Sequence, residues 1–157
     1  MIPLTNANVN NKNNNANGSK IAEQLSNVQK VRQLIKIVNT GNLENVENSI
    51  HEEYFNHESH IDVSSIQDLP ENILQQIRMR NQLSGPAEFI DTVKSLRNAF
   101  TDLIYEEKEI HSDHNMVIAH YIVRGTHTGP FFAFPPTGRY FKYEAFQTYR
   151  FENGKIK

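Results

Sequence analysis

The chain has 157 residues, with 16 Lys and Arg against 18 Asp and Glu, so its formal net charge is −2 with histidine neutral. This near balance, without any Lys/Arg block, argues against a protein that holds nucleic acid by charge. Cysteine is absent, which excludes disulfides, thiolate nucleophiles and Cys-ligated metal sites. No apolar run approaches the ~20 residues of a membrane span, and no secretory signal is visible. We therefore expect a soluble cytoplasmic protein.

The first 18 residues differ from the rest in composition. Eight of them are Asn, and only four are sizeable apolar residues. Such a segment cannot bury enough apolar surface to offset the entropy cost of ordering it. We expect residues 1–18 to form a disordered Asn-rich tail, with a docking or aggregation-prone segment as the alternative. Residues 19–157 are expected to form one folded domain.

Helical periodicity dominates the first part of this domain. Apolar residues recur at helical spacing from Ile21 to Val38, and Gly41 is a typical C-terminal stop. A shorter amphipathic helix is expected between Leu43 and Tyr54.

Two further helices follow. The first begins with Asp68 as N-cap, Pro70 in the first turn and Glu71 closing a capping box, and its apolar face is weak. The second has the clearest helical pattern in the chain, with apolar residues at spacings of four, three and four from Phe89 to Phe100.

After Asp102 the apolar period changes from helical to strand-like. Residues 103–109 alternate loosely, residues 111–115 predict a polar turn, and residues 116–124 are rich in β-branched and aromatic residues, as in a strand. Residues 125–138 hold three Gly and three Pro, so most of this segment is expected to be a loop.

The clearest strand runs from Arg139 to Phe151, because the charged residues fall on alternate positions. Asn153 and Gly154 then predict a type I′ hairpin turn, and Ile156 begins a further strand. The face expected to be buried consists of Phe141, Tyr143, Ala145, Gln147, Tyr149 and Phe151.

Helices first and antiparallel strands second predict an α+β fold, with the N-terminal helices packed on one face of a strongly curved antiparallel sheet. A sheet of this kind closes around a cone-shaped cavity, and small apolar ligands bind in such cavities.

Several motifs resemble those of one family. The segments GTHTG at 125–129, PPTGR at 135–139 and YRFENGKI at 149–156, with Phe132 between the first two, resemble the SnoaL-like polyketide cyclases of the NTF2-like superfamily. Earlier segments agree in order and spacing, namely residues 39–42, 54–57, 85–89 and 99–103. The resemblance covers about residues 21–156.

The resemblance implies an NTF2-like cone that holds a flat or cyclic small molecule without a metal or organic cofactor. The family's type reaction is an intramolecular aldol ring closure of a polyketide ester. One group removes a proton next to a carbonyl, and a donor stabilises the oxygen that gains charge. We therefore expect a cofactor-free lyase or isomerase type of protein that binds an apolar, polyketide-like carbonyl compound and forms a homodimer.

Two features differ from the family's pattern. In the family, the strand that follows the Gly-Lys-Ile run delivers an acidic residue, whereas this sequence ends at Lys157. A histidine of the polyketide cyclases falls on Gln147, which cannot titrate and orients a ligand only by hydrogen bonds. One alternative is therefore a non-catalytic small-molecule-binding or dimerisation module, and another is an epoxide or ester hydrolase.

Two residues are candidates for a catalytic base. His57 follows an aromatic pair, and histidine is the residue type most often used as a base near neutral pH, so it either acts at the mouth of the cone or caps the short helix. Asp102 lies between the clearest helix and the next strand. Its carboxylate either faces the cavity or makes a local hydrogen bond, because the dipole at a helix C-terminus disfavours an acidic residue.

Five residues are candidates for binding the substrate: His127, Phe132, Tyr143, Gln147 and Tyr149. His127 either donates to a ligand oxygen or pins its Gly-bounded turn. Phe132 belongs to an apolar loop that covers the cavity or forms a dimer contact. Tyr143 and Tyr149 serve either core or pocket, whereas a buried Gln147 requires a hydrogen-bond partner.

No metal site is expected. The histidines and glutamates between His51 and His60 match neither His-Glu-x-x-His nor a standard zinc pattern. His111 and His114, with Asp113, could hold a surface metal only weakly.

Overall fold

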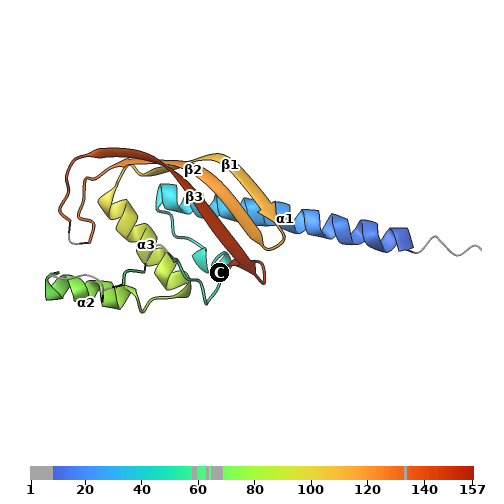
Figure 1. Ribbon diagram of the computed structural model, residues 1–157, viewed down its shortest axis with the longest axis horizontal. Helices are drawn as coiled ribbons and strands as arrows, with labels where there is room; N and C mark the ends of the chain where they lie inside the picture. The colour runs from blue at the N-terminus through green and yellow to red at the C-terminus, as the bar shows by residue number, and fades with distance from the viewer. Residues whose placement is uncertain (1–8, 58–59, 63, 65–68, 133) are drawn as a thin grey trace, which may run out of the picture.

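The computed structural model describes residues 9–57, 60–62, 64, 69–132 and 134–157. The predicted N-cap Asp68 and the first eight residues of the expected tail lie outside the described residues. In the described part, three α-helices and a short 3-10 helix precede a four-stranded antiparallel sheet (Figure 1). Their bounds are α1 Val9–Thr40, η1 Val46–Asn48, α2 Glu71–Arg80, α3 Gly85–Ala99, β1 Ile104–Asp113, β2 Met116–Thr126, β3 Tyr140–Glu152 and β4 Lys155–Ile156.

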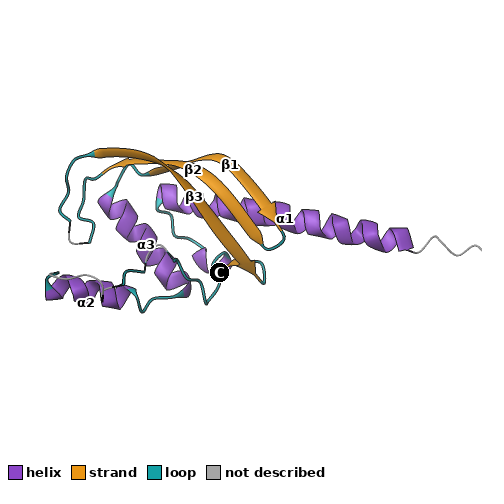
Figure 2. Ribbon diagram, viewed as in Figure 1, coloured by secondary structure: helices purple, strands orange, loops and turns teal. Residues whose placement is uncertain are grey.

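The strands lie in the order β1-β2-β3-β4, and the sheet bends over α1 and α3, which share one of its faces (Figure 2). This arrangement confirms the predicted α+β fold with helices on one face of a curved sheet. No helix in the described ranges is both long and apolar enough to cross a membrane.

Helix α1 is longer than the sequence predicts. It begins at Val9, so residues 9–18 are helical in the structure, and the disorder expected of the tail stays a prediction. The segment contains no proline to break the helix, and Gly18 costs only about 1 kcal/mol relative to alanine. The predicted stop is confirmed, because Gly41 has φ +73 and its N–H donates to the carbonyl of Ile37 at 2.7 Å. The domain boundary at residue 19 stays a prediction.

The short helix expected between Leu43 and Tyr54 is not formed. Only the three residues of η1 are helical, because Asn45 takes a left-handed backbone conformation (φ 60) that interrupts a helix. The apolar residues are buried in another way. Ile50 forms a parallel bridge with Ile156 of β4 and is fully buried.

The sheet is more regular than predicted. Strand β1 continues to Asp113, so the polar turn shrinks to His114 and Asn115. Strands β2 and β3 pair along their whole length, from Met116 opposite Arg150 to Thr126 opposite Tyr140. Asn153 and Gly154 both have positive φ, as the predicted type I′ turn requires.

The hydrophobic core lies between the helices and the concave face of β1, β2 and the end of β3. The period-2 prediction for β3 is confirmed, since the charged alternate residues are exposed. Tyr143 differs, because 52% of it is exposed and the concave face is open around it. The core includes Val31, Leu34, Val38, Phe89, Val93, Leu103, Val117, Tyr121, Val123 and Phe151.

Candidate functional site

A hydrogen-bonded pair of side chains lies on the concave face of β3. The hydroxyl of Tyr149 donates to Oε1 of Gln147 at 2.6 Å. Opposite them on β2 stand Val117 and Ala119, which are fully buried in the core. Because the carbonyl oxygen of Gln147 is engaged by Tyr149, the Nε2 group remains to donate to another acceptor.

The pair's Tyr149 and the buried Tyr121 of β2 are both neutral hydrogen-bond donors. Burial raises the pKa of Tyr121 to about 12, and burial also raises the pKa of Tyr149 well above its ordinary value. Tyr121 is 1% exposed, and its ring meets that of Tyr105 edge-on at 5.8 Å. Both hydroxyls therefore stay protonated at neutral pH, so they can donate hydrogen bonds but cannot act as bases.

A row of aromatic rings leads from the loop after β2 to the open part of the concave face. Phe100 at the end of α3 stands 5.3 Å from Phe131 and 5.2 Å from Phe141, between ring centroids. Phe141 in turn lies 5.8 Å from Tyr143. These rings form an apolar wall at the Tyr140 end of β3, and Gln147 lies further along the same face of the strand.

Asp102 makes a local structural contact. Its carboxylate accepts from the backbone N–H of Thr126 at 2.6 Å and from the Thr126 hydroxyl at 2.8 Å. These two hydrogen bonds, first that of the N–H, lower the pKa of Asp102 below its usual range. The side chain is exposed, so it ties the turn before β1 to the end of β2 and is a weak base.

His57 lies at the surface of the helical layer. Its ring is exposed and stands 4.9 Å from the ring of Phe55. The preceding residue, Asn56, donates its backbone N–H to Oε1 of the buried Glu88 on α3 at 3.1 Å. The segment that carries His57 is therefore fixed to α3 by a carboxylate that the sequence did not single out.

His127 holds the two ends of its loop together. Its N–H donates to Arg139 O at 3.0 Å, its carbonyl accepts from the N–H of Gly138 at 2.8 Å, and Nδ1 lies 3.2 Å from the Thr137 hydroxyl. Its ring packs 5.3 Å from Phe100. Each of these contacts fits the pinning role weighed in the sequence.

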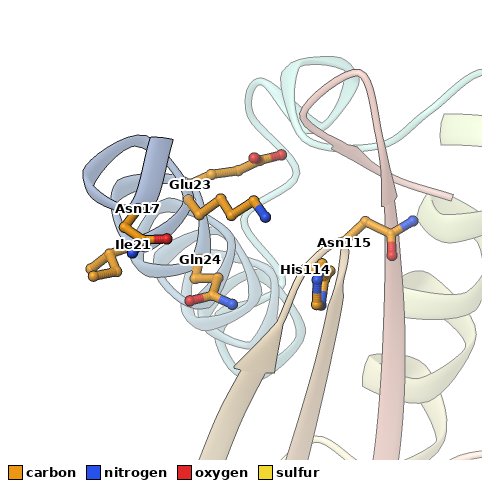
Figure 3. Close-up of a pocket in the computed structure, with 7 residues that line it drawn as sticks. Asn17, Ile21, Glu23, Gln24, His114 and Asn115 are labelled. Atoms are coloured by element: carbon orange, nitrogen blue, oxygen red, sulfur yellow. The ribbon is translucent and has the colours of Figure 1, made fainter. Parts of the chain in front are cut away.

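Phe132 lies away from Gln147 and Tyr149. It lines a pocket of about 550 Å³ between α2, α3 and the loop that follows β2. A second hollow, of about 580 Å³, lies between the N-terminal half of α1 and the β1–β2 turn, and Ile21, Gln24, His114 and Asn115 are among the residues that line it (Figure 3). Neither pocket contains Gln147, so the enclosed cone cavity stays a prediction.

The structure thus brings together Gln147 and Tyr149, with Tyr143 further along the same face of β3. His57, Asp102, His127 and Phe132 lie in other parts of the molecule. Sequence reasoning missed Tyr121, and it also missed Arg80 of α2, which pairs with Asp91 of α3 and lies over the Phe132 ring. The alternating apolar pattern of β2 predicts that Tyr121 is buried. The position of Arg80, in contrast, depends on how α2 packs against the loop after β2, which no local pattern predicts. The described residues form no group of three or more His, Asp or Glu side chains able to hold a metal ion.

Comparisons with known proteins agree with this architecture. The model of the SnoaL-like polyketide cyclases matches residues 59–157. No curated protein sequence matches the chain.

Solved structures share the fold at low sequence identity. A protein from Jannaschia sp. CCS1 assigned to the SnoaL-like polyketide cyclases has a TM-score of 0.62 at 16% identity, covering 85% of this chain and 81% of its own. TsrD from Streptomyces laurentii gives 0.63 at 16% identity, with 85% and 84% covered. IdmH from Streptomyces antibioticus gives 0.60 at 20% identity, with 83% and 86% covered.

An α+β fold with a curved antiparallel sheet bent over its helices places the chain in the NTF2-like class of folds. Within that class, the chain belongs to the SnoaL-like polyketide cyclase family.

Proposed function

We propose that this protein binds a small, largely apolar carbonyl compound against the concave face of β3, with the amide of Gln147 as the donor to the carbonyl oxygen. One observation carries the proposal: Tyr149 occupies Oε1 of Gln147 and thereby fixes which end of the amide the ligand meets. An amide held in this orientation presents N–H groups, which is what a carbonyl oxygen requires.

The surroundings support an uncharged ligand. The pKa values of Tyr121 and Tyr149 are raised by burial, so both groups are neutral at pH 7. Phe141 and Tyr143 offer ring faces further along the same face of β3, and the exposed half of Tyr143 gives access from solvent. Binding without chemistry is the function that this set of residues supports best. No hydrogen bond of the described residues links Gln147 to a carboxylate or a histidine.

The test is a titration of the full chain with 9-fluorenone, a flat aryl ketone, followed by NMR chemical shifts. We expect saturable shifts on β3 and a loss of affinity of about tenfold in Gln147→Leu, as for one lost hydrogen bond. Thr148→Val is the matched control, because Thr148 is the next residue but lies on the opposite face. Absence of saturable shifts, or equal losses in the two variants, would refute the proposal.

Acid–base catalysis of aldol cyclisation or isomerisation is the second candidate, favoured by the family match over residues 59–157. In this candidate His57 or Asp102 removes the proton next to the carbonyl, each at its own place in the molecule and apart from Gln147. His57 is the better base, because hydrogen bonds from Thr126 lower the pKa of Asp102. In a turnover assay with a polyketide-type ester, His57→Gln should abolish product formation, and an unchanged rate would rule His57 out.

We also propose that two copies associate through the convex face of the sheet. Ile118 is 42% and Phe146 69% exposed there, and His120 stacks on Phe146 at 4.3 Å. The β1 margin is mainly acidic, with Glu106 and Glu109, and the β3 margin mainly basic, with Lys142 and Arg150. A two-fold axis along β2 would place the acidic margin of one copy over the basic margin of the other.

Sedimentation at micromolar concentration tests this association. We expect a dimer that Phe146→Glu converts to a monomer. Leu25→Glu is the control, because Leu25 is similarly exposed on α1, away from the convex face. A monomeric parent protein would refute the dimer but would leave the ligand site on the concave face untouched.

A further inference from the structure

A pocket of about 550 Å³ lies on the side of α3 that faces away from the core. Its α3 residues Asp91, Ser95 and Asn98 follow one another at helical spacing, on the opposite side from the buried Phe89 and Val93. The other walls come from α2 and from the loop after β2. The pocket is therefore separate from the concave face, and its volume falls within the usual range for small-ligand sites.

Arg80 lies in this pocket with both of its Nη groups available to donate hydrogen bonds. Nε of Arg80 lies 2.8 Å from Oδ2 of Asp91, and the Arg80 side chain is only 20% exposed. Its guanidinium carbon stands 4.6 Å above the centre of the Phe132 ring. Among the described residues, the two Nη groups make no hydrogen bond, although they carry four N–H donors in one plane.

The remaining walls suit a flat apolar group. Leu83, Pro130, Phe131 and Phe132 line the pocket together with Met79, which is 69% exposed. Phe132 has φ +52, a backbone conformation that a bulky residue rarely adopts. This conformation places the ring beneath Arg80, and Phe131 meets the same ring at 4.6 Å.

We infer that the pocket between α2, α3 and the Phe131–Phe132 segment binds an aromatic carboxylate. The carboxylate accepts from the two Nη groups of Arg80, and the aromatic ring packs against Phe132 and Met79. The fork of a guanidinium matches the two oxygens of a carboxylate, whereas an ammonium would not. Asp91 is a positioning residue that holds Arg80 in the pocket as its ion-pair partner, without a hydrogen bond to Oδ2.

The rim of the pocket adds hydrogen-bonding side chains, which tolerate polar substituents on the aromatic ring of the ligand. Gln76, Ser95 and Asn98 border the pocket, and none of them carries a charge. Arg80 and Asp91 neutralise each other, so the pocket has little net positive charge. The carboxylate of the ligand is therefore recognised by the placement of the Arg80 Nη groups rather than by a general positive field. This site is independent of Gln147 and goes beyond the function proposed above.

The experiment is a fluorescence titration of the full chain with 2-naphthoate, which is clean because the protein contains no tryptophan. We expect saturable binding that Arg80→Gln weakens about tenfold or more, as for loss of charge-assisted hydrogen bonds. Arg78→Gln is the matched control, because Arg78 lies on the same helix but pairs with the exposed Glu71. The neutral analogue 2-naphthamide should bind about tenfold more weakly than 2-naphthoate.

Further variants keep the test decisive. Arg80→Lys preserves the charge but removes the fork, so it should lose most of the affinity while keeping an unchanged thermal transition. Gln147→Leu should bind 2-naphthoate as the parent protein does, which separates this site from the concave face. The inference is overturned if the parent shows no saturable binding, if Arg80→Gln and Arg78→Gln behave alike, or if 2-naphthamide binds as well as 2-naphthoate.

Discussion

The two sides of the concave face differ in what covers them. Over β1 and β2, helix α1 buries Leu34, Val117 and Tyr121 almost completely. Over β3 and the loop before it, Tyr143 is half exposed and Phe134 is 66% exposed. The concave face of the sheet is thus part of the core over β1 and β2, and an accessible surface over part of β3. Stability and ligand binding can therefore be changed independently.

The backbone pairing explains part of this difference. Strand β2 is paired along both edges, with β1 and with β3. Strand β3 is paired with β2 on one edge, but β4 pairs only with Phe151 and Glu152 on the other. Strand β1 also has one open edge, but α1 packs on it, so an open edge leaves side chains less well covered only where no helix packs as closely, as along β3. The candidate ligand-binding residues Tyr143 and Gln147 lie on this open stretch.

The largest expected effect comes from the covered side. Leu34→Ala should lower the free energy of unfolding by about 3 kcal/mol, because a fully buried leucine leaves a cavity that the packed helix cannot fill. Urea unfolding followed by circular dichroism measures the change. Leu25→Ala, on the same helix but 60% exposed, should change stability by less than about 0.5 kcal/mol. Equal effects would mean that α1 does not cover the sheet as described.

A smaller effect on folding stability, which depends on pH, is expected at Asp102 in the turn before β1. Folding lowers the pKa of Asp102, so the folded state favours its carboxylate. The resulting stabilisation is present above the unfolded-state pKa of about 4 and is lost as the pH falls through the lower folded-state value. Asp102→Asn should therefore be less stable than the parent at pH 7, and the gap should close at acidic pH.

Thermal unfolding at a series of pH values checks this expectation. Thr126→Val is the companion variant, because it removes the hydroxyl donor and keeps the backbone N–H that also binds Asp102. Thr126→Val should show part of the same pH-dependent loss of thermal stability relative to the parent protein. A gap that does not change with pH would show that the charge of Asp102 contributes nothing at this site.

Local patterns predicted the regular parts of the fold. The alternation along β3, the Asn153–Gly154 turn and the Gly41 stop each depend on the residues of one short segment, and each is confirmed. The segment from Leu43 to Tyr54 has a helical pattern but does not form the helix. Its apolar residues are buried by η1 and by the bridge from Ile50 to β4, which lies a hundred residues away in the chain.

The candidate site was predictable to the extent that it lies on one strand. Gln147 and Tyr149 share a face of β3, and the need of a buried amide for a partner was visible in the sequence. The ion pair of Arg80 with Asp91 and its stacking on Phe132 join three separate segments. No local pattern predicts such a contact, because it depends on how α2 packs against α3 and the loop.

The smallest expected effect tests the projecting start of α1. Gly18 is exposed, and an added Cβ would meet no atom within 4 Å. Gly18→Ala should raise the far-UV helical signal, because alanine favours a helix by about 1 kcal/mol. It should leave the urea midpoint unchanged, because nearby Ile21 and Leu25 are exposed and contribute little to the core. Gly18→Pro should lower the signal instead. If neither variant changes it, residues 9–18 are not helical in solution and the Asn-rich composition, rather than the absence of a helix breaker, determines their state.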